Sequence, residues 1–87
     1  DKQTEGAIYL YEKLANEGYT SPFPHERLRV IYTKQYEFKK AIFTCKRYIS
    51  ILNEFQKFDP RFSNIHLIPM LENNIAKLEL RLKPKGK

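Results

Sequence analysis

The chain has 87 residues, which is enough for one small domain or for part of a larger one. Hydrophobic residues make up 41% and charged residues 30% of it, and these globular values exclude wholesale disorder. The formal net charge of +6 favours anionic partners in general but names none of them.

The first predicted helix covers residues 3–17. Thr4 is its expected N-cap, and Gly18 stands where helices commonly end on a left-handed glycine. The chain begins without Met and is predicted to be helical almost from its first residue, as we expect of a segment of a longer protein. Its predicted buried face holds Ala7, Leu10, Tyr11 and Leu14, with Ile8 and Ala15 on its flank.

Residues 22–51 read as two amphipathic helices around a tight turn near Gln35 and Tyr36. So short a connection predicts an antiparallel helix pair. The second helix is expected to start near Pro24 or His25, because proline suits a first helical turn. Its predicted inner face consists of Leu28, Ile31, Tyr32 and Gln35.

The third predicted helix covers residues 37–57 and is apolar on more than one side, so we expect neighbouring elements on both flanks. Cys45, the only cysteine, falls on its apolar stripe and is interpreted as a small core residue in a reducing compartment. The stripe consists of Phe38, Ala41, Ile42, Cys45, Ile49 and Leu52, and further apolar residues beside it are Phe43, Tyr48, Ile51 and Phe55.

Asp59-Pro60 is a typical helix start, so we expect a short helix over residues 60–67. Pro69 is expected to interrupt it, because proline lacks the backbone N–H that a continuing helix needs. A last helix is then predicted over residues 69–82, followed by a basic tail at 84–87. The predicted core stripe of the last helix consists of Ile68, Leu71, Ile75, Leu78 and Leu82.

An internal repeat of 34 residues aligns EGAIYLYEKLANEGY with KKAIFTCKRYISILN, placing Ala7 on Ala41. At this point the chain resembles the tetratricopeptide repeat family, a helix–turn–helix unit of the same period. The matching positions are Leu28, Tyr32, the turn Tyr36-Glu37-Phe38, and Ala41. The sequence departs from the family pattern at His25, Arg29 and Asn53.

The resemblance implies an all-α fold in which antiparallel helix hairpins, four or five helices in all, stack as a short right-handed superhelix. One domain is expected over residues 3–83. It divides into a half repeat (3–18), a central repeat (22–57) and a degenerate or capping repeat (59–83).

No constellation of residues predicts an enzyme, a metal site or a cofactor. His25 and His66 are far apart in the sequence and have no other ligand-type residue at metal spacing. His25 is interpreted as a polar residue of a first helical turn, and His66 as a partly buried neighbour of Pro69. The three glycines are isolated, so they form no phosphate loop, and no serine has a base partner.

The resemblance implies a protein-interaction module, because the first helix of each pair in this family lines a concave groove for a peptide or partner helix. A carboxylate clamp is not expected, since the family uses Lys and Asn where this chain has Glu26 and Val30. The residues carried over by position are Phe23, Glu26, Arg27, Val30, Thr33 and Lys34. The alternative interpretation is that these are ordinary solvated positions or that they contact the next helix.

Two other functions stay open. A basic patch on the third helix, of Lys39, Lys40, Lys46, Arg47 and Lys57, could meet a nucleic-acid backbone, although its members do not all share one face and a solvated surface explains them as well. The terminal helices could instead pair with a second copy of the chain. No apolar run approaches the roughly 20 residues of a membrane span, and with no signal peptide the expected location is cytoplasmic.

Overall fold

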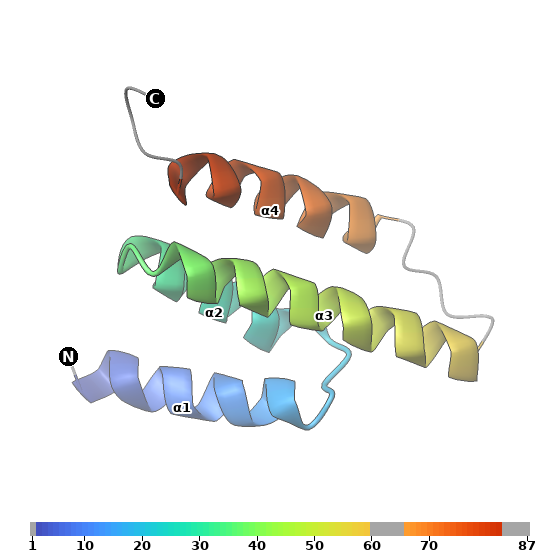
Figure 1. Cartoon of the computed structure of the whole chain (residues 1–87). Coiled ribbons are helices and arrows are strands. Elements are labelled where there is room, and N and C mark those ends of the chain that lie inside the picture. The colour runs from blue at the N-terminus through green and yellow to red at the C-terminus, as the bar shows by residue number, and fades with distance from the viewer. Residues whose placement is uncertain (1, 60–65, 83–87) are drawn as a thin grey trace.

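The computed structural model describes residues 2–59 and 66–82, and over these residues all regular secondary structure is α-helical, in four helices joined by short turns. The helices are α1 (Lys2–Asn16), α2 (Pro22–Lys34), α3 (Phe38–Phe58) and α4 (Leu67–Leu82). Successive helices run in opposite directions, and each packs mainly on the next one along the chain (Figure 1). The predicted all-α class is therefore confirmed. Of the short helix expected over residues 60–67, residues 60–65 lie outside the described part, His66 is in a turn and Leu67 already belongs to α4.

The arrangement is a flat slab, with principal extents of 45 × 35 × 15 Å. In Figure 1, α4, α3 and α1 follow one another from top to bottom, and α2 lies behind α3. Helix α3 contacts α2 on one flank and α4 on the other, as its broad apolar surface predicts. Helix α1 packs mainly on α2. The slab is thin enough that the outer helices keep much of their surface open.

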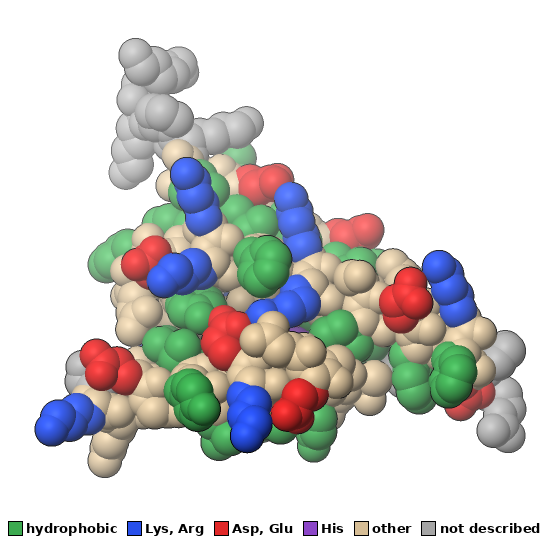
Figure 2. Space-filling view, turned by 60° about the horizontal axis from the view of Figure 1, so that its bottom comes forward, with side chains coloured by type: hydrophobic (Ala, Val, Ile, Leu, Met, Phe, Trp, Pro, Cys, Tyr) green, Lys and Arg blue, Asp and Glu red, His purple; other side chains and the backbone are tan. Residues whose placement is uncertain are grey.

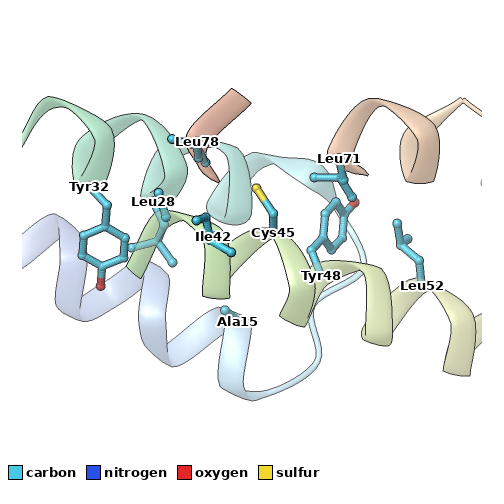
Figure 3. Close-up of a cluster of buried hydrophobic side chains, with 10 residues drawn as sticks. Ala15, Leu28, Tyr32, Ile42, Cys45, Tyr48, Leu52, Leu71 and Leu78 are labelled. Carbon is cyan, nitrogen blue, oxygen red and sulfur yellow. The ribbon is translucent and has the colours of Figure 1, made fainter. Parts of the chain in front are cut away.

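The core lies along the two flanks of α3. Tyr48 faces α2 and stacks on His25, with ring centroids 4.0 Å apart. Leu71 and Leu78 of α4 lie on the other flank, and Ala15 is the contribution of α1 (Figure 3). Cys45 is buried as predicted, and burial raises the pKa of its thiol to about 11. The buried apolar residues are Ala15, Leu28, Tyr32, Ala41, Ile42, Cys45, Tyr48, Leu52, Leu71 and Leu78.

Backbone chemistry explains both turns between the first three helices. Gly18 has φ +79°, and the N–H of Tyr19 donates to the carbonyl of Leu14 at 3.2 Å, which closes the end of α1 as the glycine predicts. Tyr36 takes the same role after α2 with φ 62°, and the N–H of Glu37 donates to the carbonyl of Tyr32 at 2.8 Å. The predicted turn at Gln35 and Tyr36 is thus confirmed.

Three predicted helix starts were wrong by a few residues, all in the same direction. Helix α1 begins at Lys2, so Thr4 lies within its first turn rather than at its cap. Helix α2 begins at Pro22 with Ser21 as N-cap, and α4 begins at Leu67 with Pro69 inside its first turn. The first four N–H groups of a helix have no partner within it, so proline at these positions costs no hydrogen bond.

Two predicted faces also need correction. Leu10 was expected in the core but is 53% exposed, because α1 turns the flank of Ile8 and Ala15 towards α2 instead. Ala7 and Leu14 are only half-buried. At the two helix ends, Gln35 is exposed after α2, and Leu82 is exposed at the end of α4.

Both histidines differ from their predicted environments. His25 does lie in a first turn, but its side chain is buried, with 2% exposed. Its Nε2 lies 2.6 Å from the carbonyl oxygen of Tyr19, and the hydroxyl of Tyr48 donates to the carbonyl of Thr20 at 2.6 Å. These two bonds draw the α1–α2 linker over the histidine. His66 is exposed in the turn before α4, because it lies off the stripe that faces α3.

Candidate interaction surface

The six residues predicted to line a binding face lie on the side of α2 that is turned away from its core stripe, and none of them is buried. Phe23, Arg27 and Lys34 are exposed. Glu26, Val30 and Thr33 are half-buried. The 3.6-residue period brings them together, since the core stripe of Leu28 and Tyr32 occupies the opposite side of the same helix.

Two of the six are engaged within α2. The carboxylate of Glu26 accepts a hydrogen bond from the guanidinium of Arg29, with Oε2 2.6 Å from Nη2. This bond raises the pKa of Arg29 against the effect of its partial burial. The hydroxyl of Thr33 donates to the carbonyl of Arg29 at 2.7 Å. Glu26 and Thr33 therefore have less bonding capacity left for a partner than their residue types suggest.

Arg27 and Lys34 instead line an open hollow between α1 and α2, with a volume of about 380 Å³. They are seven residues apart, which is two helical turns, or about 10 Å along α2. Neither forms an ion pair with the described part of the chain. We call this hollow the α1–α2 groove; its lining residues are Gln3, Thr4, Ala7, Arg27, Ile31, Lys34 and Gln35.

Apolar side chains continue the groove along both helices. On α1, Leu10 and Leu14 follow Gln3 and Ala7 at helical spacing and so extend the same stripe. On α2, the Phe23 ring meets the Tyr11 ring edge to face, with centroids 5.7 Å apart. The α1–α2 groove thus combines unpaired cations with exposed apolar surface. Figure 2 shows such mixing of exposed hydrophobic and charged side chains on the face that it displays.

The sequence reasoning missed the contribution of α1 to this groove. Ala7, Leu10 and Leu14 were recognised as an apolar stripe, but that stripe was assigned to the core. The sequence did contain a signal for this: the apolar residues of α1 span more of its circumference than one neighbouring helix can cover. Which of these apolar residues would stay exposed depended on the rotation of α1 against α2.

The five residues of the predicted basic patch do not form one free surface. Arg47 turns towards α1, where it forms an ion pair with Glu12 at 2.9 Å and keeps only 13% of its side chain exposed. Lys57 lies 3.5 Å from Glu54, and the ammonium of Lys40 lies 5.8 Å from the centre of the Tyr32 ring. Lys39 and Lys46 are exposed without an ion pair among the described residues.

A polar network links α1, α2 and α3 beside the groove. Glu12 accepts hydrogen bonds from Arg47 at 2.9 Å and from the hydroxyl of Tyr32 at 2.5 Å, and Arg47 also donates to Asn16. Burial raises the pKa of Glu12, but these bonds and the charge of Arg47 outweigh burial and lower it overall. For Tyr32, burial and the same carboxylate raise the pKa. The network fixes the relative positions of the helices that form the groove.

The described residues contain no group of three or more His, Cys, Asp and Glu side chains that could hold a metal ion. Another hollow, of about 340 Å³, lies where the α1–α2 linker meets α3, and its lining includes Ile51, Phe55 and Phe58 and one titratable side chain, Glu54.

Comparisons with protein-family models, with curated proteins and with solved structures found no match to this chain. Within residues 2–59 and 66–82, none of the helices has the length and apolar character needed to cross a membrane.

Proposed function

We propose that this chain is a non-catalytic protein-interaction module that binds a peptide or helix of a partner protein through the outward face of α2 and the α1–α2 groove. The observation that carries the proposal is the pairing of two unpaired cations, Arg27 and Lys34, with exposed apolar side chains in one hollow. Exposed Phe23 beside an exposed arginine is the combination enriched at binding hot spots.

A tetratricopeptide-like stacking of hairpins is part of the same proposal. Its support is the 34-residue offset between α1 and α3 together with the alternation of helix direction. Of the two alanines that the repeat aligns, Ala41 is fully buried and Ala7 is half-buried. We further propose a reducing, cytoplasmic setting, supported by the buried free thiol of Cys45.

The test is a selection of randomised peptides against the immobilised chain, followed by affinity measurements on charge variants. The variant R27S/K34S removes two positive charges from the groove, and K39S/K46S removes the same charge from α3. We expect the groove variant to weaken selected peptides about tenfold or more, as loss of interface hot spots does, and the α3 variant to change binding less than about threefold.

Two results would contradict this function. One is failure of the selection to enrich any peptide. The other is loss of binding in the α3 variant with full binding in the groove variant, which would move the interaction to the basic patch. Because all four substituted side chains are exposed, neither variant should unfold the chain, and circular dichroism checks this directly.

A further inference from the structure

The α1–α2 groove has the shape of a helix-binding site. It lies between two antiparallel helices, and its lining runs from Arg27 to Gln35 along α2, which is about 12 Å. That length matches about two turns of a third helix laid into the groove. The described part of the chain offers no strand, so an extended peptide would find no sheet edge to pair with.

The apolar surface of the groove is arranged for close packing. Ala7 is small, so a partner backbone can approach α1 closely at that position. Leu10 is 53% exposed and Phe23 is 58% exposed, and both would be removed from water by a helix seated between them. Ile31 is half-buried and forms part of the floor. A partner helix therefore needs an apolar stripe of its own.

The charged residues that line the groove determine which charge its partner should carry. Its lining contains two cations, Arg27 and Lys34, and no acidic residue. Since these cations lie two turns apart on one helix, carboxylates two turns apart on a partner helix match their spacing. A second copy of this chain is disfavoured as the occupant, because it would bring another net charge of +6 to a basic site.

We infer that the α1–α2 groove binds an acidic amphipathic helix, which places its apolar stripe on Ala7, Leu10 and Ile31 and pairs two carboxylates seven residues apart with Arg27 and Lys34. This inference rests on the proposed function and names the chemical class of its partner. Complementary charges select the partner and its register, and apolar burial supplies most of the affinity.

The inference is tested with three synthetic helical peptides of about 15 residues that share one apolar stripe. They differ only at two positions seven residues apart, which carry Glu, Gln or Lys. Binding to the whole chain is measured by fluorescence anisotropy at low salt. We expect the Glu peptide to bind about tenfold tighter than the Gln peptide, and the Lys peptide to bind more weakly than both.

Variants locate the effect. R27Q/K34Q should abolish the preference for Glu over Gln, whereas the matched α3 variant K39Q/K46Q should keep most of the preference. L10S should weaken all three peptides by a similar factor, because Leu10 contributes apolar contact rather than charge. All these positions are exposed, so the variants retain the fold.

Equal binding of the Glu and Gln peptides would overturn the acidic-helix inference, and the proposed function would then stand on the peptides that selection yields. Absence of binding by all three, together with a failed selection, would overturn both. Displacement of the Glu peptide from the groove by an oligonucleotide of equal charge would show that the site binds polyanions and would contradict a helical partner. A stable dimer that excludes the peptides would assign the groove to a second copy.

Discussion

At the scale of single residues, two largely buried polar side chains do more for this fold than their sequence context indicates. His25 and Arg47 each come from an amphipathic helix, and each lies against a residue far away in the chain, Tyr48 and Glu12 respectively. Their positions make them sensitive to protonation and to loss of a partner. Both therefore carry testable consequences for stability.

His25 makes stability depend on pH in the mildly acidic range. Burial lowers its pKa in the folded chain, although the Tyr19 carbonyl acts in the opposite direction, Arg47 adds to the lowering, and Glu12 opposes it. Nε2 donates to Tyr19, and the buried Nδ1 has no hydrogen-bond partner among residues 2–59 and 66–82, so a proton added there would find no acceptor in that part of the chain. Because the pKa of His25 is lowered in the folded chain, there is a pH range in which its imidazole is neutral in the fold and charged in the unfolded chain.

We therefore expect His25 to leave the free energy of unfolding undiminished above the unfolded pKa of about 6.5 and to lower this free energy as the pH drops below that value. Urea unfolding between pH 7.5 and 5 measures this slope. H25Q removes the titration but keeps a side-chain N–H for the Tyr19 carbonyl. Glu12 contributes only at lower pH, because its folded pKa lies below 4.5. An unchanged slope in H25Q would refute the assignment.

The Glu12–Arg47 pair predicts a measurable coupling energy. Arg47 keeps only 13% of its side chain exposed, and its Nε and Nη2 have no hydrogen-bond partner within the described part of the chain. Removing Glu12 would leave a largely buried guanidinium with only the amide of Asn16 among its bonded partners. We expect E12Q to cost about 2 kcal/mol, since hydrogen bonds to charged groups contribute about 1.5–3 kcal/mol.

A double-mutant cycle of E12Q with R47M isolates this interaction, and we expect a coupling of about 1 kcal/mol or more. The exposed Lys57–Glu54 pair provides the control, because solvated ion pairs contribute about 0–1 kcal/mol. Equal couplings for the two pairs would mean that burial of Arg47 has no energetic consequence.

At the scale of helices, the two described glycines act in opposite ways. Gly18 ends α1 with φ +79°, a conformation that L side chains rarely adopt, so G18A should cost about 1 kcal/mol. Gly6 lies within α1, and an added Cβ there would meet nothing within 4 Å. G6A should therefore stabilise the chain by about 0.5–1 kcal/mol through helix propensity.

The opposite signs of these two substitutions are the test, and denaturant unfolding of G6A, G18A and the double variant measures both. Because the sites lie at different parts of α1, the effects should add. A stabilising G18A would mean that α1 does not end on a left-handed residue in solution.

At the scale of the whole molecule, the flat arrangement makes stability uneven. Helix α3 is covered on two flanks, whereas α1 packs mainly on α2 and α4 mainly on α3. The residues in the middle turns of α3 are among the most buried of the described residues, including Cys45, Tyr48 and Leu52. The outer helices should therefore open more readily than the middle of the slab.

Native-state hydrogen exchange should show the slowest exchange in the central turns of α3, with faster exchange in α1 and α4. L52A should lower the free energy of unfolding by about 2–5 kcal/mol, as buried leucine truncations do. L80A, at a leucine that is 66% exposed in α4, should change it by no more than about 0.5 kcal/mol. Slower exchange in α1 than in α3 would contradict this ordering.

The fifth, short helix predicted over residues 60–67 lies mostly outside the described residues. By itself, the sequence determined the other four helical stretches, the turns at Gly18 and at Gln35 and Tyr36, and most of the buried stripes of α3 and α4. These features depend on local periodicity and backbone chemistry, which act over a few residues. The resemblance to the tetratricopeptide repeat implied one binding face on α2 with Phe23, Arg27 and Lys34, and all three side chains are exposed in the structure.

Only the tertiary structure decided which side of α1 is buried, that Arg47 leaves the basic patch to meet Glu12, and that His25 lies beneath the linker. Glu12 and Arg47 are 35 residues apart, and no local pattern encodes such a pair. Leu10 and Ile8 have similar hydrophobicity, so the rotation of α1 had to come from packing against α2. The physical reason is the same in each case: the sequence of a helix determines which side chains can be buried, and the neighbouring helices determine which of them are buried.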